Sequence, residues 1–246
     1  MPIKRYRLII QYDGSLFFGW QLQPNKKTIQ GEIEKAIQKI ISSEHRIPIY
    51  GSGRTDTGVH ANGQVAHMDI NTHLNPEELL HALNGNLTND IRIVSVELSH
   101  LDFQSRFDAI KREYRYQCYK GDSLLFRNQS WTISNPDNFY LKKLAKMIEG
   151  EHDFLSFCKY RKDVKNTKCN IYKSEWNFEG KMVIFNIIGN RFLHHMVRYI
   201  VGTMIAITEG KLSIEEFKIL LEKPKKDVKV FRAPPQGLIL EKVYYE

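Results

Sequence analysis

The stretch GSGRTDTGVHA, residues 51–61, places Arg54 and Asp56 among three glycines and then adds a histidine. Glycine loses more conformational freedom on folding than any other residue, so this density of glycine indicates a turn with unusual backbone geometry. An aspartate in such a turn commonly closes it through its own side chain. The turn can instead present the Asp56 carboxylate for chemistry, and the stretch alone favours the first role.

Three motifs that carry chemistry in other proteins do not fit this stretch. Gly53 and Gly58 have the spacing of a phosphate-binding loop, but Val59 occupies the position where that loop needs lysine. The histidines and cysteines lack the close pairing of a zinc site, and no G-x-S-x-G turn for a nucleophilic serine is present. These mismatches argue against a nucleotide hydrolase, and we expect no metal.

The charge of the chain indicates a polyanionic partner. Thirty-six Lys and Arg against 28 Asp and Glu leave a net charge of +8 in a chain of 246 residues. Two segments concentrate this charge, KYRKDVKNTK at 159–168 and EKPKKDVK at 222–229, and both are places where phosphates can sit. A basic surface with no specific partner is the alternative.

The amino-acid composition also indicates the type of protein and its cellular compartment. The contents of 42% hydrophobic and 11% aromatic residues are those of an ordinary globular protein. Three scattered cysteines do not suggest a disulfide framework, so we expect a reducing cytoplasm. We expect no membrane association, because no apolar run approaches the roughly 18 residues of a membrane span.

Hydrophobic periodicity predicts a mixed α+β protein rather than a doubly wound sheet. A polar stretch near 98–106 suggests a boundary between two halves, 1–104 and 105–246. Helices are expected at 28–43, 76–85, 141–150, 191–207 and 213–223. Strands are expected at 5–14, 64–70, 91–98, 112–120 and 237–245, with a hairpin at 174–189 that turns at Glu179-Gly180.

Residues 51–66, GSGRTDTGVHANGQVA, resemble the signature G-A/S-G-R-T-D-x-G-V-H-A of the TruA family of tRNA pseudouridine synthases. Further blocks are similar to the family in the same order, so the resemblance runs from about residue 6 to about residue 245. These blocks are YDGSLFFGWQLQPNKKTIQGEIEKAI (12–37), ALNGNLTNDIRI (82–93), RFDAIKREYRYQCY (106–119), GEHDFLSFC (150–158), GNRFLHHMVRYIVGTM (189–204) and APPQGLILEKVYY (233–245).

Three positions depart from the family pattern. Thr88 stands where the family usually has proline, and Glu113 occupies a position that is often basic or small. The segment KYRKDVKN at 159–166 falls where family members vary in length and composition. This variation bears on the choice of substrate and not on the type of reaction.

The resemblance implies the pseudouridine synthase fold, two similarly built sheet-and-helix halves around a central RNA-binding cleft. It implies an isomerase that converts uridine to pseudouridine in tRNA without a cofactor or metal, with the anticodon stem-loop, positions 38–40, as the expected target. It also implies a homodimer. A catalytically inactive RNA-binding module of the same fold is the alternative, and loss of a catalytic residue would have favoured it.

The resemblance also implies the site residues, each of which has a plainer structural interpretation. Asp56 matches the catalytic aspartate, and Arg198 matches an arginine that keeps this aspartate ionised, although an arginine on a helix flank often simply extends its charge into water. Tyr114 matches the tyrosine that contacts the uracil, where a core tyrosine is the alternative, as we expect for Tyr116. Two further residues of the chain also match positions with a role in the family.

Arg54 matches an arginine that helps to extrude the target base, and a contact to phosphate alone is its alternative role. Leu238 matches a position that forms an apolar wall of the uracil pocket, where ordinary strand core is the alternative.

Overall fold

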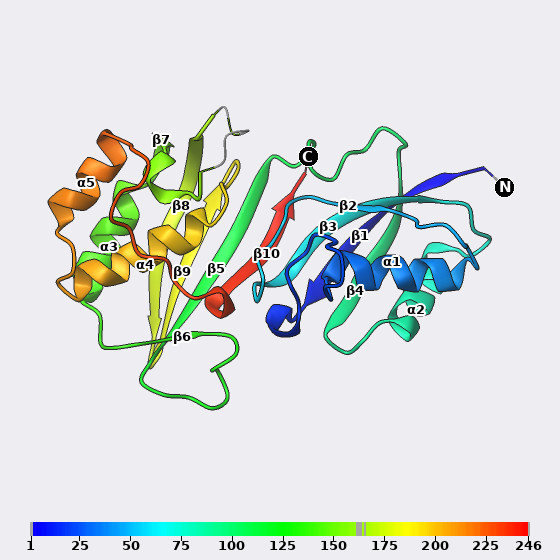
Figure 1. Cartoon of the computed structure of the whole chain (residues 1–246), viewed down its shortest axis with the longest axis horizontal. Helices are drawn as coiled ribbons and strands as arrows, with labels where there is room; N and C mark the ends of the chain where they lie inside the picture. The colour runs from blue at the N-terminus through cyan, green and yellow to red at the C-terminus, as the bar shows by residue number, and fades with distance from the viewer. Residues whose placement is uncertain (1, 161–163, 165, 246) are drawn as a thin grey trace. The chain divides into compact units, whose positions relative to one another are not determined.

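A computed structural model of the chain describes residues 2–160, 164 and 166–245. The chain divides into two compact units: the first comprises Met1–Ile110 and Leu240–Glu246, and the second comprises Lys111–Ile239 (Figure 1). Each unit combines a β-sheet with helices, which confirms the predicted α+β class. Within the described residues, no helix combines the length and apolar character needed to cross a bilayer.

The first unit is built on antiparallel strands in the order β4-β1-β3-β10, with the short β2 also paired to β3. In β1, alternate residues are buried, and these are Tyr6, Leu8, Ile10 and Tyr12. The elements of this unit are β1 (Lys4–Tyr12), η1 (Gly14–Leu16), α1 (Ile29–Ile40), β2 (Ile49–Gly51), β3 (His60–Ile70), α2 (Pro76–Asn86), β4 (Ile91–Ser99) and most of β10 (Leu238–Tyr244).

Local sequence explains the two helices of the first unit. The Thr28 side chain accepts a hydrogen bond from Gly31 N and so caps α1, whose apolar residues Ile29, Ile33 and Ile37 recur at a spacing of four and are buried. Asn75 begins α2 with a capping box completed by Glu78, and Pro76 occupies its first turn. Both helices lie where the periodicity predicts them. They pack against each other, and α2 also lies against β4.

The last strand of the chain returns to the first unit. A Cβ atom at Gly63 of β3 would lie 2.5 Å from the carbonyl oxygen of Glu241, so only glycine allows β10 to approach this closely. The amide of Asn62 donates to the Glu241 carboxylate at 3.1 Å, and Ile110 N donates to Tyr244 O at 2.9 Å. The position of β10 beside β3 therefore depends on contacts between residues that are far apart in the sequence.

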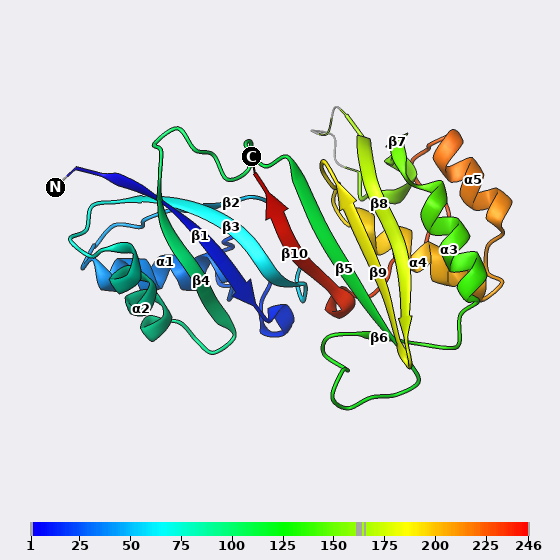
Figure 2. The same cartoon turned by 180° about the vertical axis from the view of Figure 1, so that it is seen from behind.

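The second unit carries the strand order β5-β9-β8-β7, with β6 parallel to β5. The β8–β9 hairpin turns at Glu179-Gly180 as predicted, with Gly180 at a φ of +61°. Helices α3 and α4 lie on one face of β8 and β9 (Figure 2). The elements are β5 (Lys111–Lys120), β6 (Trp131–Ile133), α3 (Asn138–Met147), β7 (Gly150–Asp153), η2 (Leu155–Phe157), β8 (Lys168–Glu179), β9 (Met182–Gly189), α4 (Met196–Thr208), α5 (Ile214–Glu222) and η3 (Pro235–Gly237).

Helix α4 begins at Met196, five residues later than the predicted start at residue 191. His195 has a left-handed backbone with a φ of +63°, which a continuous helix does not allow. The carbonyl oxygen of His194 accepts instead from Lys159 N at 2.9 Å. His194 therefore lies in a loop and outside α4, although it falls within the helix expected at 191–207.

Gly202 lets a second segment cross α4 at close range. A Cβ atom at this position would overlap the carbonyl oxygen of Phe231 and lie 2.6 Å from Ala233 N. One residue further along the helix, the Thr203 hydroxyl accepts from Phe231 N at 3.1 Å. The segment 231–233 is thus held against the helix turn that follows Arg198.

We expect Gly202→Ala to lower the free energy of unfolding by about 1–3 kcal/mol, because backbone atoms must move to admit the methyl group. Gly85→Ala in α2 is the matched control, since nothing lies within 4 Å of its Cβ position. There the helix propensity of alanine should raise stability by about 0.5–1 kcal/mol. Urea denaturation of both variants measures the difference, and equal effects would contradict the close crossing.

Candidate active site

The turn that carries Asp56 joins β2 to β3. Gly58 takes a φ of +77°, and Val59 N donates to Asp56 O at 3.1 Å, so the chain reverses directly after the aspartate. Thr55 is buried, Asp56 is half-buried and Arg54 is exposed. The turn therefore leaves part of Asp56 accessible and extends the predicted base-extruding arginine toward solvent.

The segment from Tyr12 to Trp20 holds the residue before Asp56 in place. The hydroxyls of Tyr12 and Thr55 share a buried hydrogen bond of 2.7 Å, and Trp20 N donates to Thr55 O at 3.1 Å. Gly19, at a φ of +82°, lies so close that its Cβ would be 2.6 Å from Thr55 O. The glycine of the YDG sequence, Gly14, lies closer still to the turn, since a Cβ there would overlap the carbonyl oxygen of Val59.

The other flank of the turn is held from β3. Gln64 lies fully buried and accepts from the Ser52 hydroxyl at 2.7 Å while its amide donates to Gly53 O at 2.9 Å. The Cβ position of Gly53 itself faces open space. Sequence reasoning missed Tyr12, Thr55 and Gln64 as supports of the turn, although all three lie inside the quoted blocks.

One carboxyl next to the turn has a shifted pKa. Burial raises the pKa of Asp13, but hydrogen bonds from Ser15 and the neighbouring His60 outweigh it and hold that pKa below its ordinary value. His60 is itself buried, and its Nδ1 lies 3.1 Å from both Gly14 N and Asp13 Oδ1. His60 of the opening stretch therefore supports the backbone of η1, directly after β1.

We expect Tyr12→Phe to lower the free energy of unfolding by about 1 kcal/mol, because the buried Thr55 hydroxyl loses its partner. Turnover should also slow, since Thr55 precedes Asp56. Tyr50→Phe is the control, as Tyr50 is 54% exposed. A less stable Tyr12→Phe protein with full turnover would show that this bond does not position the aspartate.

In the second unit, Arg198 lies in the first turn of α4 and is only 7% exposed. Its Nε donates to Ala233 O at 2.9 Å, and its own carbonyl oxygen accepts from Ala233 N at 2.9 Å. The guanidinium is thus held by backbone inside the unit and is not extended along the helix flank.

The segment that follows Ala233 contacts one of the two tyrosines of β5, Tyr116. Tyr116 is fully buried, as predicted, and its hydroxyl donates to Pro234 O at 2.7 Å. Burial raises the pKa of Tyr116 well above its ordinary value, against the opposing charge of Arg198. Tyr114 is half-buried, with its ring edge-on to Phe192 at a centroid distance of 5.1 Å. Leu238 is 7% exposed and begins β10.

The described parts of the two basic segments meet in the second unit. Lys226 Nζ lies 3.5 Å from the centroid of the Tyr160 ring, and Lys225 N donates to the Ser156 hydroxyl at 3.1 Å. The remainder of the predicted 159–168 segment, residues 161–163 and 165, lies outside the described residues. Lys226 of the second basic segment therefore contacts Tyr160 of the first, although the two residues are far apart in the sequence.

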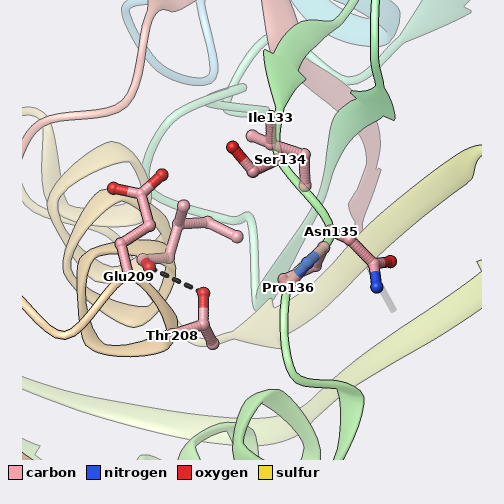
Figure 3. A pocket seen from close by; sticks show the side chains of 7 residues that line it. Ile133, Ser134, Asn135, Pro136, Thr208 and Glu209 are labelled. Atoms are coloured by element: carbon pink, nitrogen blue, oxygen red, sulfur yellow. Dashed lines mark hydrogen bonds between the residues drawn. The ribbon is translucent and has the colours of Figure 1, made fainter.

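A pocket of about 250 Å³ lies at the far end of α4 from Arg198. It opens between the chain after β6 and the last turn of the helix (Figure 3). None of the five predicted site residues lines it. The lining residues are Ile133, Ser134, Asn135, Pro136, Ile205, Thr208 and Glu209.

The predicted site residues are divided between the units. Arg54 and Asp56 belong to the first unit, where they share one braced turn. Tyr114, Arg198 and Leu238 belong to the second, where Ala233 contacts Arg198 and Leu238 follows five residues later in the chain. The first unit thus carries an acidic turn held from both sides, and the second carries a buried arginine whose charge acts on Tyr116.

The chain belongs to the tRNA pseudouridine synthase family, whose model matches residues 8–108 and 144–246. It is similar to tRNA pseudouridine synthase A of Geobacillus sp. (strain WCH70), with 39% identity over 99% of both chains. The enzyme of that name from Bacillus subtilis (strain 168) is 39% identical over 98% of this chain and 99% of its own. The predicted pseudouridine synthase fold is thereby confirmed.

Proposed function

We propose that this chain is an isomerase that converts uridine to pseudouridine in tRNA, with Asp56 as the catalytic carboxylate. The half-buried position of Asp56 in a turn braced from both sides supports this role, because a nucleophile must be held in place and still reach its substrate. Membership of the family, with relatives that align over nearly the whole chain, supports the reaction. The expected targets are uridines 38–40 of the anticodon stem-loop.

The reaction exchanges one bond for another. The N1–C1′ glycosidic bond breaks, the uracil rotates, and a C5–C1′ bond forms while the proton leaves C5 and N1 gains a proton. The carboxylate of Asp56 can attack the sugar at C1′, attack the base at C6, or assist removal of the 2′ proton. All three routes need Asp56 to be ionised.

Arg198 supplies the cation that keeps Asp56 ionised in this proposal, since an arginine next to an aspartate lowers the pKa of the carboxyl group. Its guanidinium is already oriented by Ala233, which supports a positioned charge. Tyr114 stacks on the uracil, and its half-buried ring is consistent with a partly open face. Leu238 forms an apolar wall, and Arg54 supports the extruded nucleotide.

The partner is tRNA, held by its phosphates along the basic segments that meet at Tyr160 and Lys226. We further propose that the protein works as a homodimer in the cytoplasm. Sedimentation analysis, with and without tRNA, tests the dimer directly. A monomer in both samples would refute it.

Release of tritium from tRNA transcripts labelled at uridine C5 tests the proposed activity, because formation of the C5–C1′ bond must expel that label. The wild-type protein should release tritium, and mapping of the product should place pseudouridine at positions 38–40. Binding of tRNA without release would instead support the inactive RNA-binding module.

A further inference from the structure

Phe18 lies directly beside the turn that carries Asp56. Its predecessor Phe17 accepts a hydrogen bond from Gly58 N at 3.4 Å. Its successor Gly19 lies so near that a Cβ there would be 3.0 Å from the carbonyl carbon of Asp56. Both chain neighbours of Phe18 therefore touch the turn, one on each side of the aspartate.

The backbone of Phe18 is held although its side chain is exposed. Phe18 N donates to Lys27 O at 2.9 Å, and the amide of Gln23 donates to Phe18 O at 2.8 Å. Phe17 is 1% exposed and belongs to the core, whereas Phe18 is 44% exposed. The loop thus fixes the backbone of an exposed aromatic residue beside the turn that carries Asp56.

A cation accompanies this ring. Lys26 Nζ lies 4.3 Å from the centroid of Phe18, and Lys26 is itself exposed. An aromatic ring with an adjacent ammonium group is suited to bind a single nucleotide of RNA. The base stacks on the ring, and the phosphate pairs with the cation. The net charge of +8 favours the same partner.

We propose that Phe18 and Lys26 bind the nucleotide next to the target uridine in tRNA, with its base stacked on Phe18 and its phosphate paired with Lys26. The inference rests on the proposed function, since it assumes that a uridine reacts at Asp56. When the target base leaves the stack, its neighbour loses a stacking partner, and Phe18 replaces that partner. The identity of this neighbour would then influence which uridines react.

Equilibrium binding of tRNA transcripts by the full chain tests the proposal. Phe18→Ala and Phe18→Leu should each raise Kd roughly tenfold, because leucine keeps apolar area but offers no aromatic face, while Phe18→Tyr should bind as the wild type does. Lys26→Ala should reduce the dependence of Kd on salt by about one phosphate contact. Lys39→Ala, at an exposed position of α1, should leave that dependence unchanged.

Phe107 provides a matched control in the same unit. It is 76% exposed with Arg106 5.5 Å from its ring, yet it lies in the chain between β4 and β5 and not beside the turn. Phe107→Ala should leave Kd unchanged. A Kd for Phe18→Ala equal to that of the wild type, or an equal loss in Phe107→Ala, would overturn the inference.

The outcomes also separate this inference from the proposed function. Weaker binding by Phe18→Ala, with no tritium released by the wild-type protein, would support a nucleotide contact at Phe18 and refute both the activity and the placement of that nucleotide beside a target uridine. Tritium release by the wild type, with unchanged binding and rate in Phe18→Ala, would refute only the contact. Failure of the wild-type protein to bind tRNA would refute both.

Discussion

Asp56→Asn is expected to reduce tritium release from C5-labelled tRNA by at least roughly 10⁴-fold, the scale seen when an enzyme loses its nucleophile. Asparagine has nearly the shape of aspartate, so the turn should keep the bond of Tyr12 to Thr55 and the bond of Gln64 to Gly53. Binding of tRNA and the midpoint of thermal unfolding should therefore change little. Single-turnover release and a melting curve on the same preparation measure both quantities.

Asp102→Asn is the control for this experiment, because Asp102 is exposed in the same unit and lies outside the turn. It should release tritium at the wild-type rate. Substantial release by Asp56→Asn would remove Asp56 from the central role, whichever of the three routes the reaction follows. A protein that fails to bind tRNA after the substitution would show instead that the carboxylate supports the fold of the turn.

Arg198→Ala is expected to lower kcat by roughly 10²–10³-fold, as removal of a positioned electrostatic partner does. It should also lower the free energy of unfolding by about 1–3 kcal/mol, because the carbonyl of Ala233 loses its buried donor. Arg198→Lys keeps the charge but not the planar guanidinium, so we expect it to recover only part of either loss. Turnover and urea denaturation measure the two effects separately.

Arg232→Ala is the matched control, since Arg232 precedes Ala233 but is exposed. It should retain both stability and kcat. If Arg198→Ala lost stability alone and kept its kcat, the arginine would be a structural support of segment 231–233 and no more.

Local sequence was sufficient to predict most of the helices and strands. It was insufficient to predict which of them contact one another. Helix α1 and the β8–β9 hairpin lie where periodicity and turn residues place them, because capping and turn formation act over a few residues. The predicted start of α4 was wrong. The apolar periodicity extends upstream as far as Leu193, so it gives no sign of the left-handed backbone at His195. Periodicity reports which face is buried and does not report a break in the backbone.

The candidate site shows the same division. The turn at 51–61 was recognisable because its residues are contiguous, and its resemblance to a family extended that recognition to Arg198 and Tyr114. The bond between Tyr12 and Thr55 joins residues 43 positions apart, and the contact of Lys226 with Tyr160 joins two loops. Such pairings depend on the tertiary fold, so no local pattern could have indicated them.

The position of Leu240–Tyr244 beside β3 has a consequence for synthesis of the protein on the ribosome. More than 120 residues, including the entire second unit, emerge between Ile110 and the segment that completes the first sheet. During that interval the nascent chain exposes an edge of β3 with unsatisfied backbone groups, a template for pairing with other chains. A ribosome that stalls before residue 240 would therefore yield a product prone to aggregation, even though every other strand of that sheet had already been made.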